Sequence, residues 1–205
     1  MILYTVKNGV YYNLEDFKED LSDLGKNGFP NKIYINMTNR CSCSCTFCLR
    51  SLKEFNEHNS LWLKEESSVE LVKELFSKYD WSKVAEIIFC GFGEPTMRFN
   101  DVVEVGQWLK SIHPDIPLRI NTNGLSDLVF GEPTASRLAG IFDTVSISLN
   151  SSTAQKYLDV TRNRFGLASY DAMLSFAKAC QRYVPNVVMT VVDVIGEEEV
   201  AACQK

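Results

Sequence analysis

Four cysteines lie within eight residues of this chain, in the run Cys41-Ser-Cys-Ser-Cys45-Thr-Phe-Cys48. Thiolate sulfur is a soft ligand that selects zinc, Cu(I) or iron–sulfur clusters. Structural zinc needs two ligand pairs, usually about 12 to 20 residues apart, whereas only Cys45 and Cys48 pair here and His58 has no second partner. Three ligands at Cys41, Cys45 and Cys48 would leave one iron of a cubane open, although electron-transfer clusters use four cysteines. The spacing therefore favours a cluster that binds a substrate or cofactor.

The remaining cysteines and the second histidine are expected to have no ligand role. Cys43 lies in the same loop at the wrong spacing, so it is predicted to point away and stay a free thiol. Cys90 follows an apolar strand and Cys180 lies on the apolar face of a helix, so both are predicted to pack in the core. Cys203 stands alone near the end, and His113 precedes Pro114 in a loop.

Composition indicates an ordinary globular chain. Its 205 residues are 45% hydrophobic and 23% charged, which predicts a single domain over 1–205. We find no apolar run of membrane-spanning length and no basic-then-apolar leader, and the seven cysteines are clustered and odd in number, so we expect a cytoplasmic protein with no membrane contact. A net charge of −5 gives no global basic field for nucleic acid. A local RNA-binding patch stays open at Arg40, Arg50, Arg162 and Arg164.

Residues 1–30 are expected to form an extension of a hairpin and a helix. Asn8-Gly9 predicts the hairpin turn, and Gly25 predicts the end of the helix. The helical spacing is seen in the apolar residues Leu14, Phe17, Leu21 and Leu24. A buried strand is then predicted over Lys32–Met37, leading directly into the cysteine loop. Chemistry in α/β folds gathers at such carboxyl ends of strands.

Four further strands alternate with helical patterns in the rest of the chain. The strands are expected at 84–89, 117–121, 144–149 and 187–195. Residues 49–66 read as a packed loop or a lid. Helices are expected after the capping box 67–70, after an Asn100 cap, near 135–139, near Thr153, near Tyr170 and over 197–205. This alternation predicts a parallel sheet with right-handed crossovers.

Polar motifs follow three of these strands. Gly91-Phe-Gly-Glu94-Pro95 ends the second strand, Asn121-Thr-Asn123-Gly ends the third, and Ser148-Leu-Asn150 ends the fourth. Each has a plain structural interpretation as a turn or a helix cap. Glycines also let a backbone approach a ligand closely, and a carboxylate can hold an ammonium group by a charge-assisted hydrogen bond.

Taken in order, the motifs resemble the radical SAM superfamily. Its cysteine signature prefers an aromatic residue before the last cysteine, as at Phe47, and Gly91-Phe-Gly-Glu94 looks like its Gly-Gly-Glu motif. The resemblance implies an α/β fold, a partial (β/α)6 TIM-like barrel with a curved parallel sheet. Since only five such strands are evident, the last strand is absent from this chain or the barrel is smaller.

The resemblance also implies the cofactors. A 4Fe–4S cluster on Cys41, Cys45 and Cys48 would bind S-adenosylmethionine (SAM) through its open iron, and reductive cleavage would give methionine and a 5′-deoxyadenosyl radical. The substrate is not implied, and no catalytic acid or base is assigned. The residues predicted to bind the cofactor are Gly91, Phe92, Gly93, Glu94, Asn121, Asn123, Ser148 and Asn150. In this scheme Glu94 holds the methionine ammonium group.

Within the superfamily, segments 41–50 and 91–96 are most similar to small radical SAM proteins associated with TatD-type nucleases. That similarity implies a functional association with such a nuclease, and reduction by flavodoxin or ferredoxin. Four alternatives stay open: a ribosomal-RNA adenine methylase, a glycyl-radical activase, a deazaguanine-type synthase, and a non-catalytic iron–sulfur or zinc protein. The methylases carry a further amino-terminal domain and a pair of methylating cysteines, neither of which is evident here.

Overall fold

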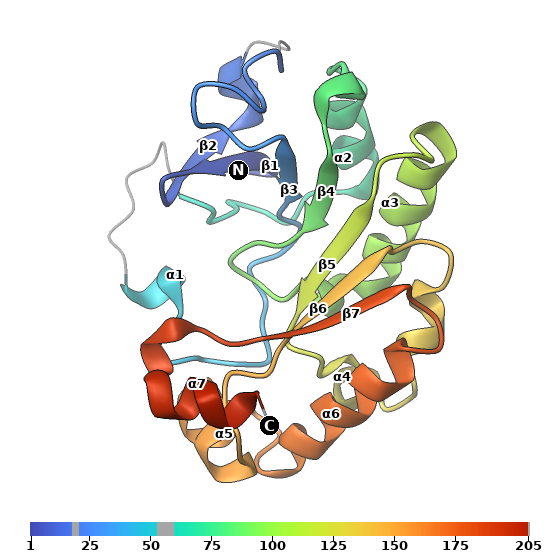
Figure 1. The fold of residues 1–205 in the computed structure, drawn as a ribbon. Coiled ribbons are helices and arrows are strands. Elements are labelled where there is room, and N and C mark those ends of the chain that lie inside the picture. The colour runs from blue at the N-terminus through green and yellow to red at the C-terminus, as the bar shows by residue number, and fades with distance from the viewer. Residues whose placement is uncertain (18–20, 53–59, 205) are drawn as a thin grey trace. The chain divides into compact units, whose positions relative to one another are not determined.

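The computed structural model describes residues 1–17, 21–52 and 60–204 (Figure 1). Two compact units divide the chain: unit 1 comprises Met1–Arg40 and Glu54–Ile120, and unit 2 comprises Cys41–Lys53 and Asn121–Lys205. The hydrogen-bonded strand order is β2-β1-β3-β4-β5-β6-β7. The chain therefore passes between the units three times: before the cysteine loop, after residue 53, and within a strand after Ile120.

Unit 1 begins with the expected hairpin. Strands β1 (Leu3–Lys7) and β2 (Val10–Asn13) pair antiparallel, and the turn residues Asn8 and Gly9 have positive φ angles of 51° and 74°. Such a turn suits the right-handed twist of a hairpin. β1 also pairs antiparallel with β3 (Lys32–Ile35), so the hairpin extends the sheet beyond the parallel strands.

The parallel part of unit 1 packs against two helices. β3 pairs in parallel with β4 (Glu86–Phe89), and β4 pairs in parallel with β5 (Leu118–Thr122). The helices α2 (Val69–Phe76) and α3 (Phe99–Ile112) contact each other and lie beside these strands (Figure 1). The fully buried side chains at their centre are those of Phe76, Phe89, Phe99, Ile33 and Ile87. β-branched and aromatic side chains of this kind favour strands buried on both faces.

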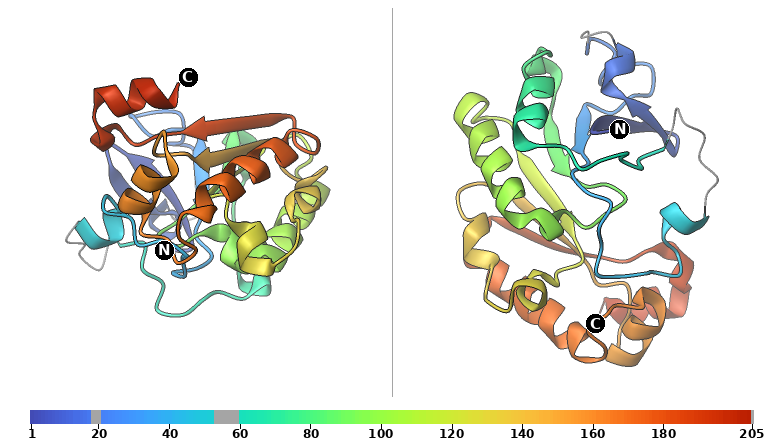
Figure 2. Two further views of the ribbon diagram at one scale, coloured as in Figure 1. Left: turned by 90° about the horizontal axis from the view of Figure 1, so that it is seen from below. Right: turned by 180° about the vertical axis from the view of Figure 1, so that it is seen from behind.

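Unit 2 is built on the parallel pair β6 (Thr144–Ser148) and β7 (Asn186–Thr190). Helices α4 (Ser126–Phe130), α5 (Ala154–Thr161) and α6 (Ala168–Cys180) follow β5 and β6, and α7 (Glu197–Cys203) follows β7 (Figure 2). The short α1 (Leu49–Leu52) continues the cysteine loop. Cys180 is completely buried in α6, as predicted, together with Met173 and Phe176.

Several expected local structures were wrong in detail. Residues 14–17 form a 3₁₀ helix instead of the start of an α-helix, and 22–25 form turns, while 18–20 lie outside the described residues. Asn100 does not cap α3, because a 3₁₀ turn over Pro95–Arg98 leads directly into Phe99. Within the capping box, Ser68 is the N-cap and accepts from the Leu71 N–H at 3.1 Å. Of the segment 49–66, residues 53–59 lie outside the described part.

The predicted fold class is confirmed. All five expected strands are present as β3 to β7 in a mostly parallel α/β arrangement, with the amino-terminal hairpin added at the edge. The strand expected over 187–195 is shorter, because β7 ends at Thr190 and Asp193–Ile195 form a 3₁₀ turn. A single domain over 1–205 stays a prediction. In the described residues we find no helix that is long and apolar enough to span a bilayer.

Candidate metal and cofactor site

The cysteine loop of unit 2 is held by the carboxyl end of α5. The Ser44 N–H donates to the Thr161 carbonyl at 2.9 Å, and the Thr46 N–H donates to the Val160 carbonyl at 2.9 Å. The last carbonyls of a helix have no partner inside it, so the loop satisfies them. The helix ends there because Arg162 is left-handed, with a φ of 47°.

The four thiols of this loop divide into two kinds. Cys41, Cys45 and Cys48 are partly exposed, whereas Cys43 is buried with 4% of its surface exposed. A hydrogen bond with Cys41 lowers the pKa of the Cys43 thiol, but a hydrogen bond with Cys45 and burial outweigh it and raise the pKa to about 12. Because the thiolate is the form that binds metal, burial and the raised pKa disfavour Cys43 as a ligand.

The donor set suits an iron–sulfur cluster. Three partly exposed thiols within eight residues supply the soft sulfur ligands that such clusters take. In residues 1–17, 21–52 and 60–204, no three Cys, His, Asp or Glu side chains already converge on a common metal position. The three thiols therefore match an iron–sulfur cluster in their chemistry, although they are not arranged around a common metal position.

Asn123 joins the segment after β5 to the cysteine loop. Its Nδ2 donates to Ser42 Oγ at 3.1 Å and to Cys43 Sγ at 3.5 Å, and its Oδ1 accepts from the Leu125 N–H at 3.0 Å. Asn123 thus positions the loop through its buried cysteine. Asn121 is half-buried within β5 itself. The structure therefore brings Asn123 onto the loop, and the cofactor role of both residues stays a prediction.

At the end of β6, Asn150 ties two strand ends together. Asn150 is 5% exposed with a φ of 55°, its own N–H donates to the Thr190 carbonyl at 3.3 Å, and its Oδ1 accepts from the Val192 N–H at 3.2 Å. A structural role for this side chain is therefore clear. Ser148 is half-buried and pairs with Thr190 in the sheet.

The glycine motif of unit 1 is a site of close approach, but to protein atoms. A Cβ on Gly91 would lie 2.0 Å from Asn36 Oδ1, and a Cβ on Gly93 would lie 2.2 Å from the Thr38 carbonyl oxygen and 2.7 Å from that of Arg40. The glycines thus admit the segment that follows β3. Their contact with a cofactor stays a prediction.

Glu94 is held by hydrogen bonds of both its backbone and its carboxylate. Its N–H donates to the Arg40 carbonyl at 2.8 Å, and its Oε1 accepts from the Thr96 N–H at 3.1 Å and from the Thr96 hydroxyl at 2.7 Å. The carboxylate, 5% exposed, thereby caps the 3₁₀ turn Pro95–Arg98. Its orientation is set before any ligand arrives, and its backbone is bonded to the residue that precedes Cys41.

Asn36 is a residue that sequence analysis missed. It is 1% exposed, and its Nδ2 donates to the Met1 carbonyl at 3.1 Å and to the Leu61 carbonyl at 2.6 Å. Its Oδ1 faces Gly91 and has no hydrogen-bond partner in the described part of the chain. An amide between Ile35 and Met37, at the end of an apolar strand, was the signal that could have found it.

A cavity of about 790 Å³ in unit 2 was also missed. Its walls come from the cysteine loop at Thr46 and Phe47, from α5, and from the segment 194–199. Lys156 and Glu199, both lining residues, form an ion pair across it. This pair and hydrogen bonds from Ser152 lower the pKa of Glu199 to about 2. The loop that carries the predicted ligands thus borders a cavity of cofactor size.

Comparison with known proteins gives the family. The Radical SAM superfamily model matches residues 35–203, so the chain belongs to this superfamily. Its members use a 4Fe–4S cluster and SAM, which confirms both predicted cofactors.

Curated relatives are enzymes of the same superfamily. The GTP 3′,8-cyclase of Paenarthrobacter nicotinovorans is 25% identical over 134 residues, covering 64% of this chain and 35% of the relative. The GTP 3′,8-cyclase of Corynebacterium glutamicum is 28% identical over 154 residues, covering 69% and 37%. A Methanocaldococcus jannaschii protein named for glycyl-radical enzyme activation is 28% identical over 117 residues, covering 57% and 44%. The chain thus spans less than half the length of these relatives.

A solved structure supports the fold. A radical SAM methyltransferase from Sphaerobacter thermophilus superposes with a TM-score of 0.57 at 14% identity, over 84% of this chain and 51% of that one. At this identity the likeness concerns the fold alone. It agrees with the α/β architecture expected from the sequence.

Proposed function

We propose that this chain is the cofactor-binding part of a radical SAM enzyme that reductively cleaves SAM at a cluster held by Cys41, Cys45 and Cys48. The observation that carries the proposal is the division of the loop thiols, three partly exposed and one buried, beside a cavity of about 790 Å³. The curated relatives are named for cyclisation and for enzyme activation. Since these overall reactions differ, SAM cleavage is the step that we carry over.

The loop-side cavity is proposed to take the adenosyl part of SAM. Phe47 and Val160 give it apolar walls, and its volume lies within the range of about 300–1,000 Å³ usual for cofactor sites. When bound, the reduced cluster supplies the electron that cleaves SAM to methionine and a 5′-deoxyadenosyl radical. The chain's own residues hold and orient the cofactor, with the Glu94 carboxylate proposed to bind the methionine ammonium group.

Finer assignments rest on the sequence motifs. Segments 41–50 and 91–96 support membership of the TatD-associated subgroup, and with it a functional link to a TatD-type nuclease. A low-potential one-electron donor is needed, and we propose flavodoxin or ferredoxin. The clustered, odd-numbered cysteines support a reducing compartment, and thus the cytoplasm.

Anaerobic incubation of the reconstituted protein with SAM and dithionite tests the proposed reaction. Chromatography should show 5′-deoxyadenosine and methionine, formed slowly even without a substrate, because an unquenched radical takes hydrogen from nearby groups. Accumulation of S-adenosylhomocysteine would indicate methyl transfer instead. Intact SAM after incubation with a fully loaded, reduced cluster would contradict the proposal.

A further inference from the structure

Trp62 is an exposed tryptophan next to the glycine motif of unit 1. About half of it, 47%, is exposed. Its ring meets the ring of Phe92 edge to face, with centroids 5.7 Å apart and planes at 75°. Phe92 lies between Gly91 and Gly93, in the loop that we propose to bind the cofactor. Nearly half of the tryptophan therefore stays accessible beside that loop.

The backbone on both sides of Trp62 is firmly held. Leu61 and Leu63 are buried, with 2% and 9% exposed. Asn36 Nδ2 donates to the Leu61 carbonyl at 2.6 Å, and Asn39 both donates to the Leu63 carbonyl at 2.8 Å and accepts from its N–H at 3.1 Å. The same Asn36 packs against Gly91. One buried amide thus sets the position of the tryptophan segment relative to the glycine motif.

A second aromatic residue extends this surface. The ring of Tyr11 on β2 also contacts the ring of Phe92, with centroids 6.1 Å apart and planes at 82°. Phe92 is nearly buried between its two neighbours. Tyr11, Phe92 and Trp62 together form an aromatic wall, defined by these three residues, whose most exposed member is the tryptophan. Planar rings stack on such side chains favourably and with little loss of conformational freedom.

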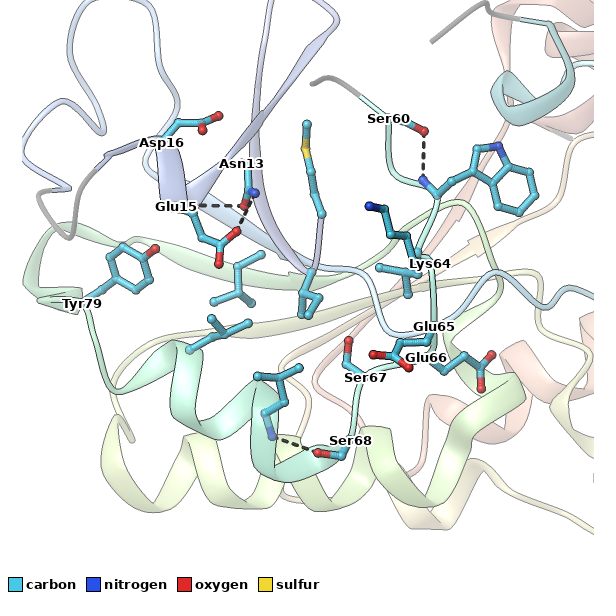
Figure 3. Close-up of a pocket in the computed structure, with 17 residues that line it drawn as sticks. Asn13, Glu15, Asp16, Ser60, Lys64, Glu65, Glu66, Ser67, Ser68 and Tyr79 are labelled. Atoms are coloured by element: carbon cyan, nitrogen blue, oxygen red, sulfur yellow. Dashed lines mark hydrogen bonds between the residues drawn. The ribbon is translucent and has the colours of Figure 1, made fainter. Parts of the chain in front are cut away.

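The cavity that Trp62 borders selects the chemistry of a ligand. It has a volume of about 1030 Å³ and lies within unit 1 (Figure 3). Its charged lining groups are the carboxylates of Glu15, Asp16, Glu65 and Glu66, of which Glu66 is ion-paired with Arg40, and two cations, the Lys64 ammonium and the amino terminus at Met1. The carboxylates therefore outnumber the cations. Carboxylates accept hydrogen bonds and repel anions. A ring that carries N–H donors fits this lining, and a phosphate chain does not.

We infer that Trp62 is a substrate-binding residue whose exposed indole stacks on a planar heteroaromatic ring that carries N–H donors and no phosphate. This inference rests on the proposed function, since it places the ring beside the cofactor loop. The contact with Phe92 holds the indole in place, and the carboxylates of the cavity accept from the donors of the ring.

Guanosine is the probe, because its base carries N–H donors and it lacks phosphate. Its affinity for the SAM-saturated protein with an oxidised cluster is measured by equilibrium dialysis. Trp62→Ala should weaken binding about five- to a hundredfold, the range of base–aromatic stacking. Trp62→Phe should restore most of the affinity. Leu167→Ala, which shortens a residue of unit 2 that is 50% exposed, is the matched control and should bind as the unsubstituted protein does.

Three outcomes overturn the inference: no guanosine binding by the unsubstituted protein, equal affinity in Trp62→Ala, or tighter binding of GTP than of guanosine. Thermal unfolding of each variant checks that the fold is kept. If Trp62→Ala does not fold, the guanosine affinity of Trp62→Phe is compared with that of the unsubstituted protein instead. Formation of 5′-deoxyadenosine by the unsubstituted protein without nucleoside is scored separately. Failure of SAM cleavage is thereby distinguished from failure of ring binding.

Discussion

At the scale of single residues, identical side chains acquire different chemistry from their surroundings. Cys43 is buried and hydrogen-bonded by Asn123, and its pKa is raised to about 12, whereas Cys45 lies two residues away and is partly exposed. Spacing suggested this difference, and burial gives it a physical cause. Cys43 anchors the loop from inside, while the other three cysteines keep part of their surface exposed.

Alanine variants of the four loop cysteines test this assignment. Cys41→Ala, Cys45→Ala and Cys48→Ala should each lose the bound 4Fe–4S cluster, because each removes one of three ligands. Cys43→Ala should keep most of it, since the variant loses only a packing group. Iron and sulfide are counted on anaerobically reconstituted protein. A Cys43→Ala variant as iron-free as Cys45→Ala would show that the ligand assignment is wrong.

Glu94 is tested by a change that keeps its shape. Glu94→Gln retains an oxygen that can accept from Thr96 but removes the charge, and a charge-assisted bond contributes about 1.5–3 kcal/mol. The affinity for SAM should therefore fall about tenfold or more, with iron content unchanged. Thr96→Val is the control, because it removes only the hydroxyl bond to Glu94. Equal SAM affinity in Glu94→Gln would place the carboxylate outside the site.

At the scale of elements, the segments after the strands are locked to one another within each unit. In unit 1 the glycine motif packs on the backbone that follows β3, and in unit 2 the cysteine loop bonds to the end of α5. The start of α7 is bonded to the segment after β6 through Glu199, which accepts from the Ser152 N–H at 2.7 Å. Each of these contacts holds in place a loop that no regular secondary structure would otherwise fix.

Gly93→Ala tests the close approach in unit 1. The added Cβ would meet carbonyl oxygens of the backbone, which cannot turn away as a side chain can. We expect a loss of about 3 kcal/mol or more in the free energy of unfolding. Gly131→Ala is the control, since nothing lies within 4 Å of its Cβ and only its φ of 71° is strained, at about 1–2 kcal/mol. Similar losses in both variants, measured by denaturant unfolding, would contradict the steric account.

The docking of α7 should depend on pH through Glu199. Its pKa is lowered in the folded state from 4.5 to about 2. The contribution to stability is therefore fully present above about 4.5 and is lost as the pH falls toward 2. The protection factors for hydrogen exchange of residues 197–203 should fall over this window, and Glu199→Gln should show low protection already at neutral pH. Glu198→Gln is the matched control; if it speeds exchange as much, Glu199 is not the anchor.

At the scale of the whole molecule, the sequence predicted the alternation of elements and the placement of the motifs. Buried β-branched runs such as Ile87–Phe89 marked the strands, and the cysteine loop and glycine motif lie at the strand ends as expected. The helix expected over 14–24 is not formed as such, although Leu14, Leu21 and Leu24 are buried. The apolar spacing there correctly indicated which side chains are buried. It did not establish a helix, because turns can bury the same side chains.

The parts of the site that escaped prediction depend on contacts between distant segments. Asn36 and Gly91 are 55 positions apart, and no local pattern shows that one fills the space of the other. The cavity beside Phe47 likewise needs α5 and α7 in place before it exists. Motif recognition supplied the class of cofactor, while packing decides which residues hold the loops and which can touch a ligand.

The central claim is that three cysteines leave one iron open for SAM. Electron paramagnetic resonance of the dithionite-reduced protein, recorded before and after addition of SAM, tests it most directly. We predict that SAM shifts the g-values of the reduced cluster, in the unsubstituted protein and in Cys43→Ala alike, because SAM becomes a ligand of the open iron. A spectrum unchanged by saturating SAM, from a fully loaded cluster, would mean that all four irons already have protein ligands and would contradict the account.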